Sequence, residues 1–212
     1  PLAAITVHLL SKQPASGEST WEPLLKTATD TNGKYEFAGV PFSEYLLAFE
    51  DSRYIPRYQL QFYPNAQTSQ DAQTITLTTG AEIVTSNVTL SGLGRIQGMV
   101  TMADGQPAPD AIVRVYQLSG PQNPLSARFA AVNGGAYEIA ALPAGRYYVS
   151  AAANEEQPAT IFYPNATEAA AAQPITITES SVISGIDLQL PAMAGQISGH
   201  VTDEAGQPIS NI

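Results

Sequence analysis

One eight-residue stretch occurs twice in this 212-residue chain and constrains the fold more than any other feature. It reads GRIQGMVT at 94–101 and GQISGHVT at 195–202, and a polar turn ending in Gly-Gln-Pro follows each copy. The copies share both glycines and the alternating Ile and Val. We therefore predict a tandem array of similar β domains, with a repeat of about 100 residues.

Other segments repeat in the same order along the chain. The matching pairs are Pro1–Leu10 with Pro109–Leu118, 33–37 with 135–139, and 62–66 with 162–166. The first copy holds extra residues between Ser11 and Trp21, in a stretch that contains Pro, Ser and Gly. Such differences between repeats usually lie in surface loops, so we expect a loop there.

Within each copy the apolar residues alternate with a period of two, which is typical of β-strands that bury one face. The alternating sets are Ile5, Val7 and Leu9, then Tyr45, Leu47 and Phe49, and in the second copy Tyr147, Val149 and Ala151. Further strands are expected at Arg128–Val132, Ala136–Ala140, Ala159–Tyr163, Ile175–Thr178 and Val182–Leu190, with counterparts in the first copy. We predict an all-β fold of tandem antiparallel sandwiches with about seven strands each.

The repeat also predicts domain boundaries. Residues 1–92 form a first sandwich that lacks its first strand, because Pro1 matches Pro109 and the signature strand precedes Pro109. Residues 93–191 form a complete second sandwich. Residues 192–212 then supply the first strand of a third repeat.

Composition argues against several functions. The net charge is −10, the wrong sign for a phosphate backbone or an anionic membrane, so we expect no nucleic-acid partner. The chain has no cysteine and two histidines, and no run of about 18 apolar residues, so we expect no cofactor, no metal and no membrane insertion.

Asp30, Asn32 and Gly33 could suggest a calcium loop, but the second copy lacks a carboxylate there, which favours a hairpin turn. We find no paired nucleophile and base, and therefore predict that the chain is not an enzyme.

The motifs resemble a known family. They are the G-x-I-x-G-x-V-T strand, the segment TDTNGKYEF at 29–37, LPAGRYYV at 142–149 and FYPNA at 62–66 and 162–166. This order is similar to that of carboxypeptidase regulatory-like domains, a group related to transthyretin and to the collagen-adhesin B-type domains of bacterial surface proteins. The resemblance implies a prealbumin-like or Ig-like sandwich that serves as a stalk, spacer or accessory module on a secreted bacterial or archaeal protein.

Some prealbumin-like modules bind glycans, so carbohydrate binding is an alternative function. Trp21, Tyr63 and Tyr163 are the candidate stacking residues, although the repeated Phe-Tyr-Pro-Asn segment is equally well explained as a packing corner. Asn87 and Asn165 match the N-glycosylation sequon, by modification or by chance.

Our main hypothesis is a structural or adhesive segment of an extracellular stalk, adhesin or filament. The strand at 195–202, with Ile197, Gly199 and Val201 on one face, could fill the vacancy in the first sandwich of another copy and build a head-to-tail fibre. Alternatively, the 212 residues belong to a longer array, and an upstream repeat of the same polypeptide supplies the missing strand. The sequence does not decide whether the partner is another copy of the chain or an adjacent repeat of a longer polypeptide.

Overall fold

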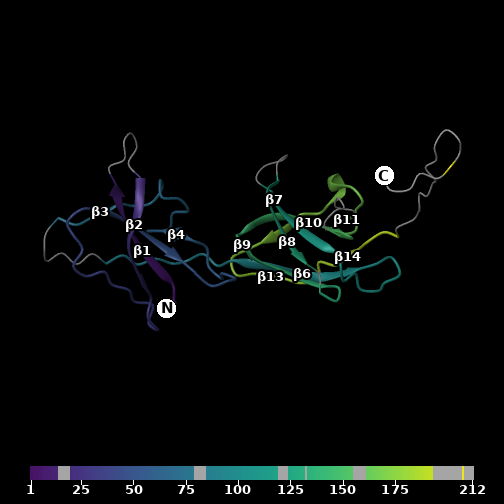
Figure 1. Cartoon of the computed structure of the whole chain (residues 1–212), viewed down its shortest axis with the longest axis horizontal. Helices are drawn as coiled ribbons and strands as arrows, with labels where there is room; N and C mark the ends of the chain where they lie inside the picture. Colours follow the sequence, from purple (N-terminus) through teal and green to yellow (C-terminus); the bar gives the residue numbers. More distant parts are fainter. Residues whose placement is uncertain are drawn as a thin grey trace.

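The computed structural model describes residues 1–13, 20–78, 85–118, 124–131, 133–154, 161–192 and 207. These residues form β-strands and one short 3-10 turn at Ala169–Ala171 (Figure 1). The prediction of an all-β sandwich fold is confirmed. Within this described part, no helix has the length and apolar character needed to cross a membrane.

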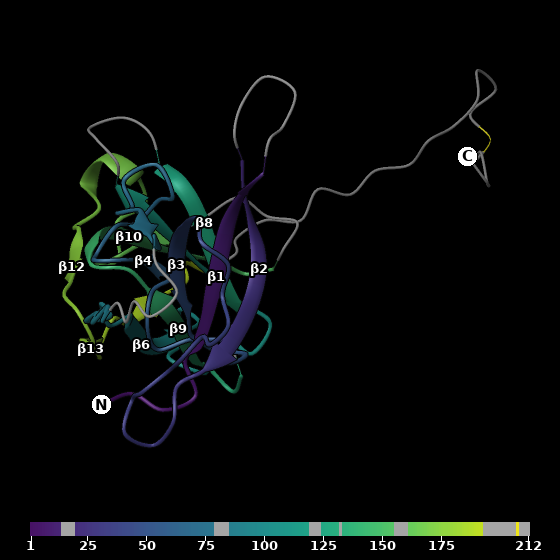
Figure 2. The ribbon, with the colours of Figure 1, turned by 90° about the vertical axis from the view of Figure 1, so that its left-hand side faces the viewer.

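The N-terminal part, which we define as residues 1–90, contains one sheet in the order β2-β1-β3-β4, with β5 beside β3. Its strands are β1 Thr6–Gln13, β2 Thr20–Ala28, β3 Glu44–Glu50, β4 Gln61–Phe62 and β5 Ile75–Thr76. All of its pairings are antiparallel, and Figure 2 shows the long strands β1 and β2 side by side. The predicted inward residues of β1 and β3 form the core of this part, as expected from their alternation. Leu46 and Ala48 are buried as well, so β3 is covered on both faces.

The C-terminal part, residues 94–190, is a sandwich of two sheets. One sheet has the order β11-β10-β7-β8 with β12 beside β10, and its strands are β7 Ile112–Leu118, β8 Pro124–Ala131, β10 Gly145–Ala152, β11 Ile161–Phe162 and β12 Ile175–Ile177. The other sheet comprises β6 Gly94–Thr101, β9 Ala136–Leu142, β13 Val182–Ile183 and β14 Leu188–Gln189.

Strand β6, the first copy of the repeated stretch, is the centre of the second sheet. It pairs with β9 antiparallel on one side and with β13 and β14 parallel on the other, so every pairing in this sheet involves β6. Ile96 and Val100 point into the core and are fully buried. The parallel pairs differ from the wholly antiparallel sandwich that the repeats predict, because the chain crosses from the other sheet before it returns beside β6.

The predicted strands that correspond to β9 and β14 are not formed in the N-terminal part, and the counterpart of β13 falls outside the described residues. Lys34–Ala38 and 85–90 have no strand structure, and 82–84 lie outside the described residues. Lys34–Ala38 and 85–90 match β9 and β14, which pair with β6, and no described residue occupies the corresponding place beside these two segments. The prediction was wrong here because a strand requires a hydrogen-bonded partner, which local alternation does not supply.

The expected loop between Ser11 and Trp21 is also partly wrong. Ser11 belongs to β1, Trp21 belongs to β2, and Lys12 pairs directly with Trp21. The extra residues therefore lengthen a hairpin, whose connection at 14–19 lies outside the described residues.

The connection between the two parts makes hydrogen bonds of its own. The Gln59 N–H donates to Ser91 O at 2.9 Å, and the Leu93 N–H donates to Arg57 O at 2.8 Å. Gly92, between them, lies so close to Ser180 of the C-terminal part that an added Cβ would stand 1.9 Å from the Ser180 hydroxyl oxygen. The connection thus contacts both parts.

Candidate functional site

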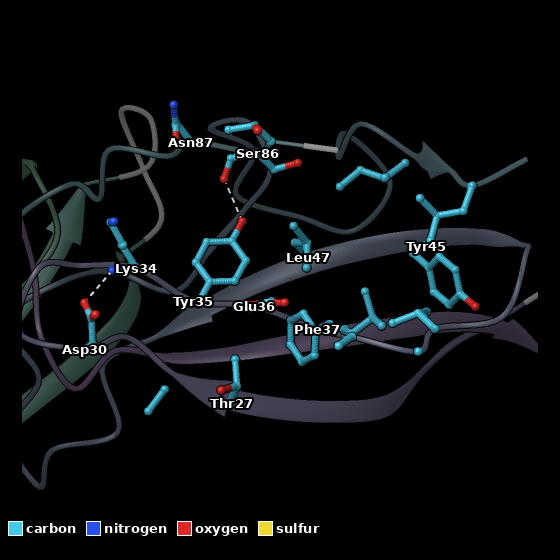
Figure 3. Close-up of a pocket in the computed structure, with 18 of the residues that line it drawn as sticks. Thr27, Asp30, Lys34, Tyr35, Glu36, Phe37, Tyr45, Leu47, Ser86 and Asn87 are labelled. Carbon is cyan, nitrogen blue, oxygen red and sulfur yellow. Dashed lines mark hydrogen bonds between the residues drawn. The ribbon is translucent and has the colours of Figure 1, made fainter. Parts of the chain in front are cut away.

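A groove with a volume of about 1100 Å³ opens in the N-terminal part, at the place that corresponds to β6 (Figure 3). One wall is the segment 34–40 and the other is the segment 85–87. The floor is apolar and is formed by side chains of the core strands and their neighbours, namely Leu9, Tyr45, Leu47, Ile75 and Leu77. We call this feature the open groove.

Both walls present unpaired backbone groups. Within the described part of the chain, the backbone of Tyr35 to Gly39 makes no hydrogen bond, and neither do the backbone N–H groups of Ser86 to Leu90. A pair of facing, unsatisfied edges is the arrangement that accepts an additional β-strand.

Tyr35 holds the two walls together across the groove floor. Its hydroxyl donates to the carbonyl oxygen of Ser86 at 2.6 Å, and Figure 3 shows the ring reaching from one wall to the other. The ring packs edge-on against Phe49, with centroids 5.5 Å apart. Burial, together with the nearby Tyr63, raises the pKa of Tyr35 to about 12, so the hydroxyl keeps its proton and donates throughout the physiological pH range.

The C-terminal part contains the same contact with a strand in place. Tyr137, which the repeat matches to Tyr35, donates from its hydroxyl to Ile186 O at 2.6 Å, and Ile186 is matched to Ser86. The tyrosine passes beneath β6 at Gly98, where an added Cβ would lie 2.1 Å from Ile186 O and 2.9 Å from the Tyr137 ring. The equal hydroxyl-to-carbonyl distances indicate that the walls of the open groove are already spaced for one strand.

Side-chain burial shows what β6 contributes. The residues that pack around β6 in the C-terminal part are 1–4 % exposed, namely Ile139, Leu142, Ile177 and Leu188. Their counterparts around the open groove are only partly buried, namely Phe37, Val40, Leu77 and Val88. The open groove therefore leaves apolar surface exposed that a strand would cover.

Asp30 shapes one end of the groove. Its Oδ1 accepts hydrogen bonds at 2.8 Å from the backbone N–H groups of both Asn32 and Lys34. The bond from Lys34 is the main cause of a lowered pKa at Asp30. These bonds form the Asx-type turn that the sequence favours at this place.

The candidate residues from the sequence fall in different places. Ile197, Gly199 and Val201 lie outside the described residues, so their role stays a prediction. Asn87 is exposed on a wall of the open groove. Asn165 is exposed elsewhere, and its Oδ1 accepts a bond from the Gln189 N–H at 2.8 Å. Glycosylation of the two asparagines stays a prediction.

The three candidate glycan contacts do not form one platform. Tyr63 and Tyr163 are half-buried against the two separate cores, each before a cis-proline. Trp21 is half-buried on β2, opposite Lys12. The positions of the tyrosines favour the packing-corner interpretation of the repeated Phe-Tyr-Pro-Asn segment.

Sequence reasoning missed Tyr35 and Ser86, the residues that fix the groove. The signal was present in the repeat, because Tyr35 aligns with Tyr137 and the signature strand carries a central glycine in both copies. Only the structure shows that the Tyr137 side chain crosses β6 at Gly98.

No known protein-family model matches the chain, and no curated protein matches it significantly in sequence. Among solved structures, the minor pilin of Streptococcus agalactiae shares 10 % identity at a TM-score of 0.41, with 94 % of this chain and 87 % of the pilin covered. A streptococcal ancillary pilin shares 16 % identity at a TM-score of 0.38, and the Bacillus anthracis TIE protein shares 15 % at 0.33. The match covers 88 % and 89 % of this chain but only 57 % and 30 % of those two proteins. At TM-scores below 0.5, these similarities assign the chain to no family and to no function.

Proposed function

We propose that this chain is a structural segment of an extracellular stalk, adhesin or filament, in which an added β-strand completes the N-terminal sandwich. The observation that carries the proposal is the open groove, whose two unpaired edges are held one strand apart by the bond between Tyr35 and Ser86. Strand addition uses main-chain hydrogen bonds for affinity and side-chain pockets for specificity, and the groove offers both.

Burial supports the same function. Partly exposed apolar side chains line the groove where the C-terminal sandwich is sealed by β6. Covering apolar surface contributes roughly 25 cal/mol per Å², so an added strand would stabilise the N-terminal part substantially. A sandwich completed from outside becomes mechanically joined to whatever supplies the strand, which suits a load-bearing role.

The proposal can be tested by supplying the strand covalently. Residues 94–108 would be grafted directly before Pro1, which reproduces the order found before Pro109. We expect a higher melting temperature for the N-terminal part, and slower hydrogen exchange at the amides of 35–39 and 86–90. The matched control is the same graft carrying Gly98→Val, which should give neither effect. If both grafts leave exchange unchanged, the groove does not accept a strand and the proposal fails.

A further inference from the structure

We propose that the strand received by the open groove is residues 195–202 of a second copy of this chain, in a register that places Gly199 over Tyr35. This inference rests on the proposed function and names its partner. Ile197 and Val201 would then enter the apolar floor on either side of the tyrosine.

The register follows from β6. Its inward residues are Ile96, Gly98 and Val100, and the glycine is required because Tyr137 and Ile186 O occupy the space of a side chain. The pattern Ile-x-Gly-x-Val occurs twice in the chain, at 96–100 and 197–201. The first copy already forms β6, so the second is the segment of this sequence that matches the groove.

Polar groups on one wall match this register. In the C-terminal part, the Met99 N–H donates to Asp187 Oδ1 at 2.8 Å, and the Leu190 N–H donates to Thr101 O at 2.8 Å. The repeat puts Asn87 in the place of Asp187 and Leu90 in the place of Leu190. The Asn87 side chain can accept a bond from the His200 N–H in the same way. The Leu90 N–H, which makes no hydrogen bond within the described residues, would donate to Thr202 O.

Chain length excludes docking of this strand into the groove of its own molecule. Leu190 is bonded to Thr101 at the carboxyl end of β6, whereas the connection to the N-terminal part enters at Gly94, at the opposite end. The eight residues of β6 span about 25 Å at the usual rise of a strand. Residues 191–194 can extend over about 14 Å, which is too short to return along β6 to the groove.

The donated strand and the open groove that receives it therefore lie at opposite ends of the chain. Figure 1 shows β14 on the side of the C-terminal part that is farthest from β1 and β3. Contacts between unlike ends of identical molecules extend into open polymers unless their rotation closes a ring. The inference thus implies head-to-tail association.

The test uses the full chain and one glycine. Sedimentation velocity over a range of concentrations should show self-association of the unmodified protein, and Gly199→Val should weaken it about tenfold or more, because a side chain there meets the tyrosine. Ser198→Val is the matched control, since it places the same side chain on the outward face of the same segment and should preserve association.

A second pair of variants tests the groove. Asn87→Asp should preserve association, because Asp187 accepts the corresponding backbone hydrogen bond in the C-terminal part, and Asn87→Leu should weaken association.

A peptide of residues 194–203 separates this inference from the proposed function. The peptide should bind the Gly199→Val chain and slow exchange at 35–39 and 86–90, and the same peptide with Gly199→Val should not. If the peptide binds but the unmodified chain stays monomeric, the strand comes from elsewhere in a longer polypeptide, and the second copy is refuted. If the peptide fails while the 94–108 graft protects the groove, the named segment is wrong and strand addition stands. Failure of both overturns the function as well.

Discussion

Tyr35 and Tyr137 make the same hydrogen bond in different surroundings, and this difference can be measured. Tyr137 is buried beneath β6, whereas Tyr35 is only half-buried and lines the open groove together with Ser86. Removing a donor from an enclosed carbonyl costs about 1–3 kcal/mol. We expect Tyr137→Phe to lower the free energy of unfolding by about that amount, and Tyr35→Phe to lower it by clearly less. Urea unfolding of both variants checks this, and equal losses would show that the groove is closed to water.

The carboxyl group of Asp51, directly after β3, predicts that the stability of the protein depends on pH. Burial would raise its pKa, but hydrogen bonds from the Arg53 guanidinium, at 2.6 and 2.5 Å, and from the backbone N–H of Arg57, at 2.6 Å, lower it to about 2. A lowered pKa in the folded state stabilises the protein above the unfolded value of 3.8, and this stabilisation is lost as pH falls toward 2.

We therefore expect the free energy of unfolding to fall between pH 5 and pH 2 by up to about 2 kcal/mol more in the unmodified chain than in Asp51→Asn. Half of the Arg53 side chain is exposed, and solvent screening makes this figure an upper bound. Equilibrium denaturation of both proteins across this range gives the difference. Parallel pH curves for the two would contradict the role assigned to this carboxylate.

At the scale of elements, alternation predicts strands well where a partner strand belongs to the described chain. Val7 and Leu9 in β1, and Ile5 directly before it, are buried as their spacing indicates, and Tyr147 and Val149 are buried in β10. The same reasoning fails for Lys34–Ala38, whose sequence resembles β9 but which pairs with no strand of the described residues. Trp21 shows the reverse case, because residues that look like a loop extend a hairpin when a neighbouring strand pairs with them.

The central strand of the complete sandwich yields a prediction of its own. An added methyl at Gly98 would meet Ile186 O at 2.1 Å, and a backbone atom in a packed sheet cannot move aside cheaply. We expect Gly98→Ala to destabilise the C-terminal part by about 1–3 kcal/mol. Met99→Ala, which alters the partly exposed neighbour on the other face of β6, should cost much less. Calorimetric melting of the two variants is the measurement, and similar losses would show that the tyrosine crossing tolerates a side chain.

At the scale of the whole molecule, the contacts of the connection between the two parts could not be predicted from the sequence. The backbone of Ser91 and Leu93 bonds to Gln59 and Arg57, and the Asp51 carboxylate accepts from the backbone N–H groups of Arg57 and Tyr58. Residues about 30–40 positions apart thus form one clamp, which no local pattern reveals. The same limit applies to the open groove, whose walls are separated by about 50 residues and become neighbours only in the fold.

We expect this clamp to fix the orientation of one part relative to the other. Inserting Gly-Ser-Gly-Ser between Gly92 and Leu93 would separate the bond from Leu93 to Arg57 from the contact of Gly92 with Ser180. We expect each part to keep its own melting temperature while the two reorient independently, which small-angle X-ray scattering would detect as a broader distribution of dimensions. The same insertion after Gly105, in a turn with open space around it, should leave the distribution nearly unchanged. If the two insertions scatter alike, the connection does not fix the orientation of the two parts.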